Sequence, residues 1–156
     1  MKKANLVLAA ALAAAGVTSV ATGLLMPATA IAQAAPQKIG AKMLKPLKAA
    51  QEAIGAKNWE AAIASLTEAQ AIEPKSPYEA FMVDELGWYA RLQTKDYKGA
   101  EEALARAVAS GFVADADVPQ RNKALAQINY QIQDYAKAVE YGNKYLVAAP
   151  GSADIG

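Results

Sequence analysis

"NWEAAIASLTEAQAIEP", residues 58–74, decides the fold, because the spacing of its apolar residues returns twice farther along the chain. The pattern starts at an aromatic residue, and Trp59, Tyr97 and Tyr135 follow one another at one constant interval. Repetition at a fixed interval of about 20 to 50 residues is typical of arrays in which each pair of helices stacks on the next. The repeated positions are Trp59, Ala62, Leu66 and Ala69 in the first copy, Tyr97, Ala100, Leu104 and Ala107 in the second, and Tyr135 and Ala138 in the third.

Signals for helix starts and ends divide the chain after Pro36 into six helices. We expect the first helix to begin near Met43 or Pro46, because proline is tolerated only in a first turn, and to end at Gly55. Asn58 is the predicted cap of the second helix, which runs to about Ile72. The first two helices are therefore expected to form an antiparallel pair.

The other four helices have equally clear signals. Ser76 followed by Pro77 and Glu79 is a capping box with proline at its preferred position. Asp96 and Asp134 are the predicted caps of the fourth and sixth helices. The remaining boundaries are Gly111 at the end of the fourth helix, Pro119 at the start of the fifth, and Pro150 beyond the sixth. The sequence thus predicts an all-α chain of three antiparallel helix pairs.

The chain of 156 residues contains neither Cys nor His, and this excludes several kinds of site. Without Cys there is no disulfide, no thiolate zinc site and no cysteine nucleophile. Without His the chain lacks the usual acid–base group at neutral pH and the commonest metal ligand. The net charge is +1 and the charges are interspersed, which indicates neither nucleic-acid binding nor a basic membrane-binding patch. We therefore expect no cofactor and no metal.

The start of the chain, at 1–34, has the composition of a secretory signal peptide. Two lysines precede an uncharged stretch that continues to Lys38, and small residues form cleavage sites after Ala32 or Ala34. The alternative is an uncleaved membrane anchor, because residues 4–26 are uncharged and long enough to span a bilayer. Gly, Ser and Thr residues inside this stretch favour cleavage. The rest of the chain is then expected to be periplasmic or secreted.

The repeated pattern resembles the tetratricopeptide repeat, whose second helix has an aromatic residue, then small and bulky residues at these offsets, and ends at proline. The first helix of that repeat carries a Leu-Gly or Leu-Ala pair, which Leu86-Gly87 and Leu125-Ala126 match. The resemblance implies a right-handed α-solenoid of about three helix-turn-helix repeats. Its expected parts are a linker at 35–41, an array at 42–150 with repeats at about 42–75, 76–112 and 118–150, and residues 151–156 as a tail or the start of a truncated fourth repeat.

The chain departs from the family pattern in two respects. The family period is about 34 residues. Each interval here is four longer, and the excess lengthens the first helix of the second repeat and the loop around residues 114–118. Gly142 replaces the bulky residue of the third copy, where it costs about 1 kcal/mol of helix stability relative to Ala.

In this family the first helices of the repeats line a concave groove that holds a partner segment. The resemblance therefore implies the groove residues Phe81, Asp84, Trp88 and Arg91 from the second repeat, and Gln120, Lys123, Gln127, Tyr130 and Gln131 from the third. Only Lys123 and Gln127 approach the clamp that grips a peptide carboxylate in the best-known members, so that ligand is not inferred. The alternative role of Trp88 is packing against the neighbouring repeat. The alternative for Arg91 and Lys123 is that they are solvated charges.

An enzyme of this composition would have to work with carboxylates alone. Asp84 and Glu85 are adjacent on a predicted helix and point about 100° apart, so they do not face a shared substrate. We expect instead a non-catalytic scaffold of the bacterial cell envelope that binds a partner protein or peptide, and neither nucleic acid nor a small-molecule substrate. The alternatives are an assembly factor anchored in the inner membrane by an uncleaved N-terminal helix, and the N-terminal fragment of a longer repeat protein.

The last helix is expected to leave an apolar edge at the end of the array. The residues of this edge are Ala138, Val139, Tyr145 and Leu146. A solenoid normally ends in a polar capping helix. We therefore expect more chain, a partner or a second copy of the protein to cover this edge.

Overall fold

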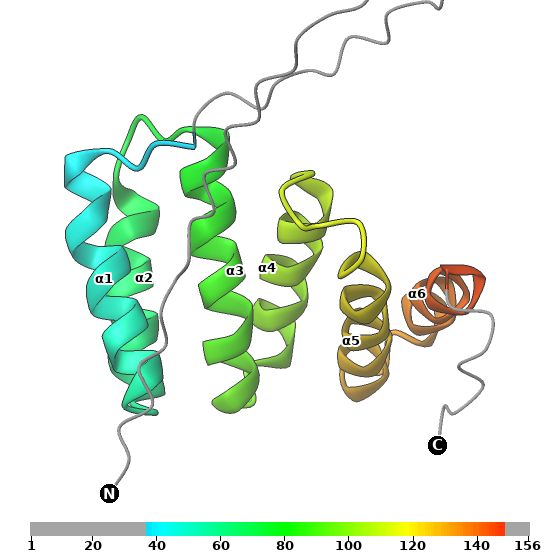
Figure 1. The fold of residues 1–156 in the computed structure, drawn as a ribbon. Helices are drawn as coiled ribbons and strands as arrows, with labels where there is room; N and C mark the ends of the chain where they lie inside the picture. The colour runs from blue at the N-terminus through cyan, green and yellow to red at the C-terminus, as the bar shows by residue number, and fades with distance from the viewer. Residues whose placement is uncertain (1–36, 149–156) are drawn as a thin grey trace, which may run out of the picture. The chain divides into compact units, whose positions relative to one another are not determined.

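A computed structural model describes residues 37–148, and every regular element in that range is a helix. The helices are α1 (Ala41–Gly55), α2 (Trp59–Ala71), α3 (Pro77–Gln93), α4 (Tyr97–Ala109), α5 (Val118–Gln131) and α6 (Tyr135–Ala148) (Figure 1). The all-α prediction is confirmed for this range. The predicted signal peptide, the first two residues of the linker, the last two residues of the array and the tail lie outside the described residues.

Local capping residues set the helix starts where the sequence predicts them. The side-chain oxygen of Asn58 accepts a hydrogen bond from the Ala61 N–H (3.2 Å), and that of Asp96 accepts one from the Gly99 N–H (3.0 Å). Ser76 caps α3 in a complete capping box. Each cap satisfies a backbone N–H that has no partner inside its helix.

The start of α1 differs from the prediction. The helix begins at Ala41, and Pro46 lies inside it and is buried. Proline at this position leaves one carbonyl of the first turn without its helical partner, but the N–H groups of Met43 and Leu44 still bond to the carbonyl of Gly40 (2.9 and 3.2 Å). The early start turns Met43 into the core with Leu47, and this burial offsets the lost hydrogen bond.

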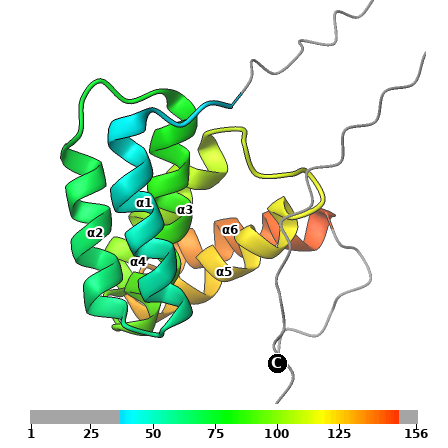
Figure 2. The ribbon, with the colours of Figure 1, turned by 60° about the vertical axis from the view of Figure 1, so that its left-hand side comes forward.

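Consecutive helices pack side by side in chain order, and the closest associations are within three hairpins (Figures 1 and 2). We call α1–α2 the first hairpin, α3–α4 the second and α5–α6 the third. The first helix of the second hairpin, α3, contacts both α1 and α2. Two clusters of buried side chains result: one joins α1, α2 and α3, and the other joins α4 and α5 with α3 and α6 at its border.

The three hairpins share one turn conformation. Its middle residue is Lys57, Lys95 or Gln133, and each of these has a positive φ of 56–65°. The N–H of the residue that follows bonds to a carbonyl five residues back in all three turns, at 2.8–3.0 Å. The interval that separates Trp59, Tyr97 and Tyr135 is therefore present in the backbone as well as in the side chains.

Candidate functional site

The small and bulky residues assigned to packing are buried in the first two hairpins. Leu66 and Leu104 are 1% and 0% exposed, and the neighbouring alanines of the pattern are equally buried. In the third hairpin the same positions are more open. Tyr135 is 56% exposed and packs edge-on against Tyr130, with ring centroids 5.6 Å apart. The positions of the packing pattern are thus better buried in the first two hairpins than in the third.

The α3 residues assigned to the groove are occupied by contacts inside the protein. Asp84 is buried, and both of its carboxylate oxygens accept hydrogen bonds from Arg106 of α4 at 2.7–3.2 Å. Phe81 packs against Phe112 in the loop after α4, with centroids 5.5 Å apart. The guanidinium of Arg91 lies 3.6 Å from the carboxylate of Asp96.

Trp88 is likewise held by a neighbouring helix. The guanidinium of Arg121 on α5 lies over its ring, 5.1 Å from the centroid, and also pairs with Glu85. Burial raises the pKa of the Glu85 carboxyl above its ordinary value, and the nearby charge of Arg121 acts in the opposite direction. A hollow of about 330 Å³ remains beside these residues, where Trp88 and the predicted groove residue Gln120 come together.

All the α5 residues assigned to the groove except Gln120 lie on an open surface. Together with residues of α6 they line an apolar hollow of about 430 Å³, which we call the α5/α6 groove. Its α5 residues are Lys123, Ala126, Gln127, Tyr130 and Gln131. Its α6 residues are Tyr135, Ala138, Val139, Gly142 and Tyr145. The structure therefore separates the predicted groove residues into an occupied α3 set and an open α5 set.

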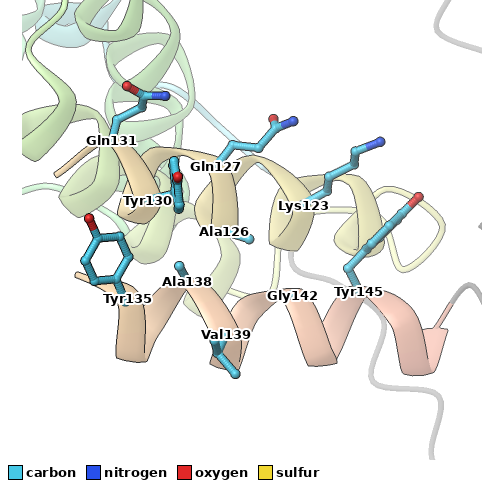
Figure 3. A pocket seen from close by; sticks show the side chains of 10 residues that line it. All are labelled: Lys123, Ala126, Gln127, Tyr130, Gln131, Tyr135, Ala138, Val139, Gly142 and Tyr145. Atoms are coloured by element: carbon cyan, nitrogen blue, oxygen red, sulfur yellow. The ribbon is translucent and has the colours of Figure 1, made fainter. Parts of the chain in front are cut away.

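The α5/α6 groove has a different character at each end (Figure 3). Tyr130 and Tyr135 lie at one end, and Lys123 and Tyr145 lie at the other. The ammonium of Lys123 is 5.4 Å from the ring centroid of Tyr145, and within residues 37–148 it forms no ion pair. Gly142 lies between the two ends, where a Cβ atom would meet no atom of the described residues within 4 Å.

These surroundings suit the binding of an apolar group. Val139 and Tyr130 are each 63% exposed, so a ligand could remove substantial apolar surface from water here. Among the described residues that line the groove, Lys123 at its edge is the one with a charged side chain. No cluster of three potential metal ligands occurs within the part of the chain that the structure describes.

The sequence pattern assigns the residues of the groove to three different roles. Those assigned to partner binding are Lys123, Gln127, Tyr130 and Gln131, those assigned to repeat packing are Ala126, Tyr135 and Ala138, and those assigned to an apolar edge are Ala138, Val139 and Tyr145. Of that edge, Val139 and Leu146 are exposed but Tyr145 is only 4% exposed. The one signal that could have located the hollow is Gly142, which stands where the earlier copies have Leu66 and Leu104.

In comparisons with known proteins, no family model matches the chain and no curated protein is significantly similar to it. None of the helices at residues 41–148 is both long and apolar enough to cross a membrane.

Proposed function

We propose that the protein is a non-catalytic interaction scaffold that binds a partner protein through the α5/α6 groove. The observation that carries the proposal is the apolar hollow between α5 and α6, which no side chain of the described residues fills. Monomeric proteins rarely leave large contiguous apolar patches open to water, and such patches commonly mark interaction sites. Exposed tyrosines at the rim of such a hollow are typical of binding surfaces.

The proposal extends to the class of fold and to the compartment. The shared turn of the three hairpins and the repeated small residues support a solenoid of repeats that resemble the tetratricopeptide repeat. The composition of the chain at 1–34 supports secretion to the periplasm or beyond. The resemblance also supports a surface for one partner segment, although the α3 side chains assigned to it are occupied by Arg106, Arg121 and Asp96.

The test is chemical cross-linking of the protein in the cells that make it, followed by purification and mass spectrometry. Val139→Asp would place a charge in the groove, and it should reduce recovery of the partner at least tenfold relative to the original protein. Val147→Asp is the matched control, because Val147 lies on the same helix, is 83% exposed and does not line the groove. The control should recover the partner fully.

Two results would count against the proposal. One is that the original protein cross-links to no protein more than an unrelated secreted protein does. The other is that Val139→Asp and Val147→Asp recover the same partner equally well, which would place the interface elsewhere. Thermal melting of both variants should match the original protein, since both valines are exposed.

A further inference from the structure

The first hairpin shows what covers a surface equivalent to the α5/α6 groove. Because the hairpins repeat at one constant interval, a shift of two intervals relates positions in the first and third hairpins. Lys123 then corresponds to Leu47, and Gly142 corresponds to Leu66. In the first hairpin these two leucines are buried in one cluster with Val83 of α3, which lies against both α1 and α2. The α5/α6 groove is therefore equivalent to the surface that α3 covers.

The contact beneath α3 shows how the two surfaces differ. The Leu66 side chain reaches to within 3.9 Å of where a Cβ of Gly87 would lie, so a bulky residue of the hairpin meets a glycine of the covering helix. In the third hairpin the bulky residue is replaced by Gly142, and the space above it is open. A helix that covers the groove must therefore supply the bulky residue itself.

We propose that the α5/α6 groove binds an amphipathic helix of a partner protein, which inserts a bulky apolar side chain at Gly142 and places an acidic side chain beside Lys123. The inference rests on the proposed function and names the chemistry of the partner. Binding of an amphipathic helix in an apolar groove is a common mode of recognition. The partner helix would lie on the third hairpin in the same way that α3 lies on the first hairpin.

Charge favours an acidic partner over a second copy of this chain. Lys123 takes the place of the buried Leu47, so the covering helix meets a cation where α3 meets an apolar side chain. In a second copy, the helix that corresponds to α3 in the first hairpin is α1. That helix presents the exposed lysines Lys42, Lys45 and Lys48, and these would repel Lys123.

The test places a bulky residue either on the bound peptide helix, at residue 87, or on the protein, at residue 142. Two stapled, fluorescent peptides copy α3 (Pro77–Gln93), one unchanged and one with Gly87→Leu, and each is titrated into the purified protein and into its Gly142→Leu variant. The original protein should bind the Gly87→Leu peptide about 10 to 100 times more tightly, which is the range for burial of a leucine side chain. The Gly142→Leu variant should reverse the preference.

The contribution of Lys123 is measured with the same peptide. The helix copied from α3 carries Glu79 on the side that meets the first hairpin, so Lys123→Gln should weaken binding of the Gly87→Leu peptide several-fold. The weakening should shrink as salt is added. Lys98→Gln is the matched control, because Lys98 is exposed on α4 and does not line the groove. It should leave the affinity unchanged.

Three results would overturn the inference. The first is binding of neither peptide, and the second is equal binding of both peptides by the original protein. The third is an oligomer in analytical ultracentrifugation that Gly142→Leu dissociates, which would make a second copy the occupant. A melting temperature of Gly142→Leu at or above that of the original protein shows that the variant is folded. The cross-linking of Val139→Asp decides the proposed function separately, because it does not depend on the shape of the partner.

Discussion

The first and third hairpins have equivalent surfaces, of which one is covered by a helix and the other is covered by no described helix. On the first hairpin the surface is covered by α3, and its leucines Leu47 and Leu66 are 4% and 1% exposed. On the third hairpin no described helix covers it, and the equivalent residues are Lys123 and Gly142. The comparison teaches that the repeat preserves the helices and turns, while the side chains at each surface depend on what that surface contacts.

The interfaces between successive hairpins also differ in their polar links. The second and third hairpins are joined by two ion pairs, Arg121 with Glu85 and Lys137 with Glu101. The first and second hairpins have an apolar interface whose polar link lies at one end, where the Gly40 N–H donates to the carboxylate of Glu79 (2.8 Å). The covered surface of the first hairpin thus depends chiefly on burial.

The largest expected effect on the free energy of unfolding follows from this difference in burial between the first and third hairpins. Leu66→Ala should lower the free energy of unfolding by about 2–5 kcal/mol, because it opens a cavity beneath α3. Val139→Ala, on the open surface, should change the free energy of unfolding by about 0.5 kcal/mol or less. Equilibrium urea unfolding measures both. Equal losses for the two variants would show that the third hairpin is as well covered as the first.

A smaller effect of opposite sign is expected at Gly142. Gly142→Leu should raise the free energy of unfolding by about 1 kcal/mol, because leucine favours the helix and has room in the groove. Gly99→Leu is the informative control, since a side chain there would collide with Asp96 and Arg91 and should destabilise the protein. A loss of stability for Gly142→Leu in the same urea experiment would mean that the groove has no room.

The smallest expected effect concerns the polar link at the end of the covered surface. Hydrogen bonds from the backbone N–H groups of Ser76 and Gly40 lower the pKa of Glu79 below its ordinary value of 4.5. The stability that this lowering contributes is present above the ordinary value and is lost as the pH falls toward the lower, folded-state pKa. A plot of melting temperature against pH should therefore be flatter below pH 4.5 for Glu79→Gln.

Glu68→Gln is the control for this pH dependence. Glu68 is exposed on α2 and makes no hydrogen bond among the described residues. Its variant should follow the curve of the original protein. If Glu79→Gln follows that curve as well, Glu79 does not hold α3 over the first hairpin through its charge.

The fold was predictable because its signals are local. Asn58, Ser76 and Asp96 each cap a helix with their own side chains, and such caps can be read within four residues of sequence. The start of α1 was misplaced because the decisive contact is distant. Burial of Met43 with Val83 of α3 stabilises the turn before Pro46, and no local signal reports it.

The candidate site was only partly predictable for the same reason. Lys123 and Tyr130 were assigned to binding, and they line the groove. Asp84 was assigned to binding as well, but Arg106 lies 22 residues away in sequence, and only the packing of α4 on α3 brings the two side chains together. The role of Gly142 depends on an uncovered surface, which a repeat pattern alone does not distinguish from a covered one.

The turn conformation that the three hairpins share has a consequence for how the gene could gain further repeats. Its left-handed residues Lys57, Lys95 and Gln133 recur at one constant interval, so duplication of one such interval of codons, begun anywhere within the repeated region, would restore the same turn in register. Unequal recombination would then insert a whole helical hairpin without breaking a helix. A hairpin inserted before α5 would leave the residues of the α5/α6 groove unchanged, so the number of hairpins and the recognition of a partner can evolve separately.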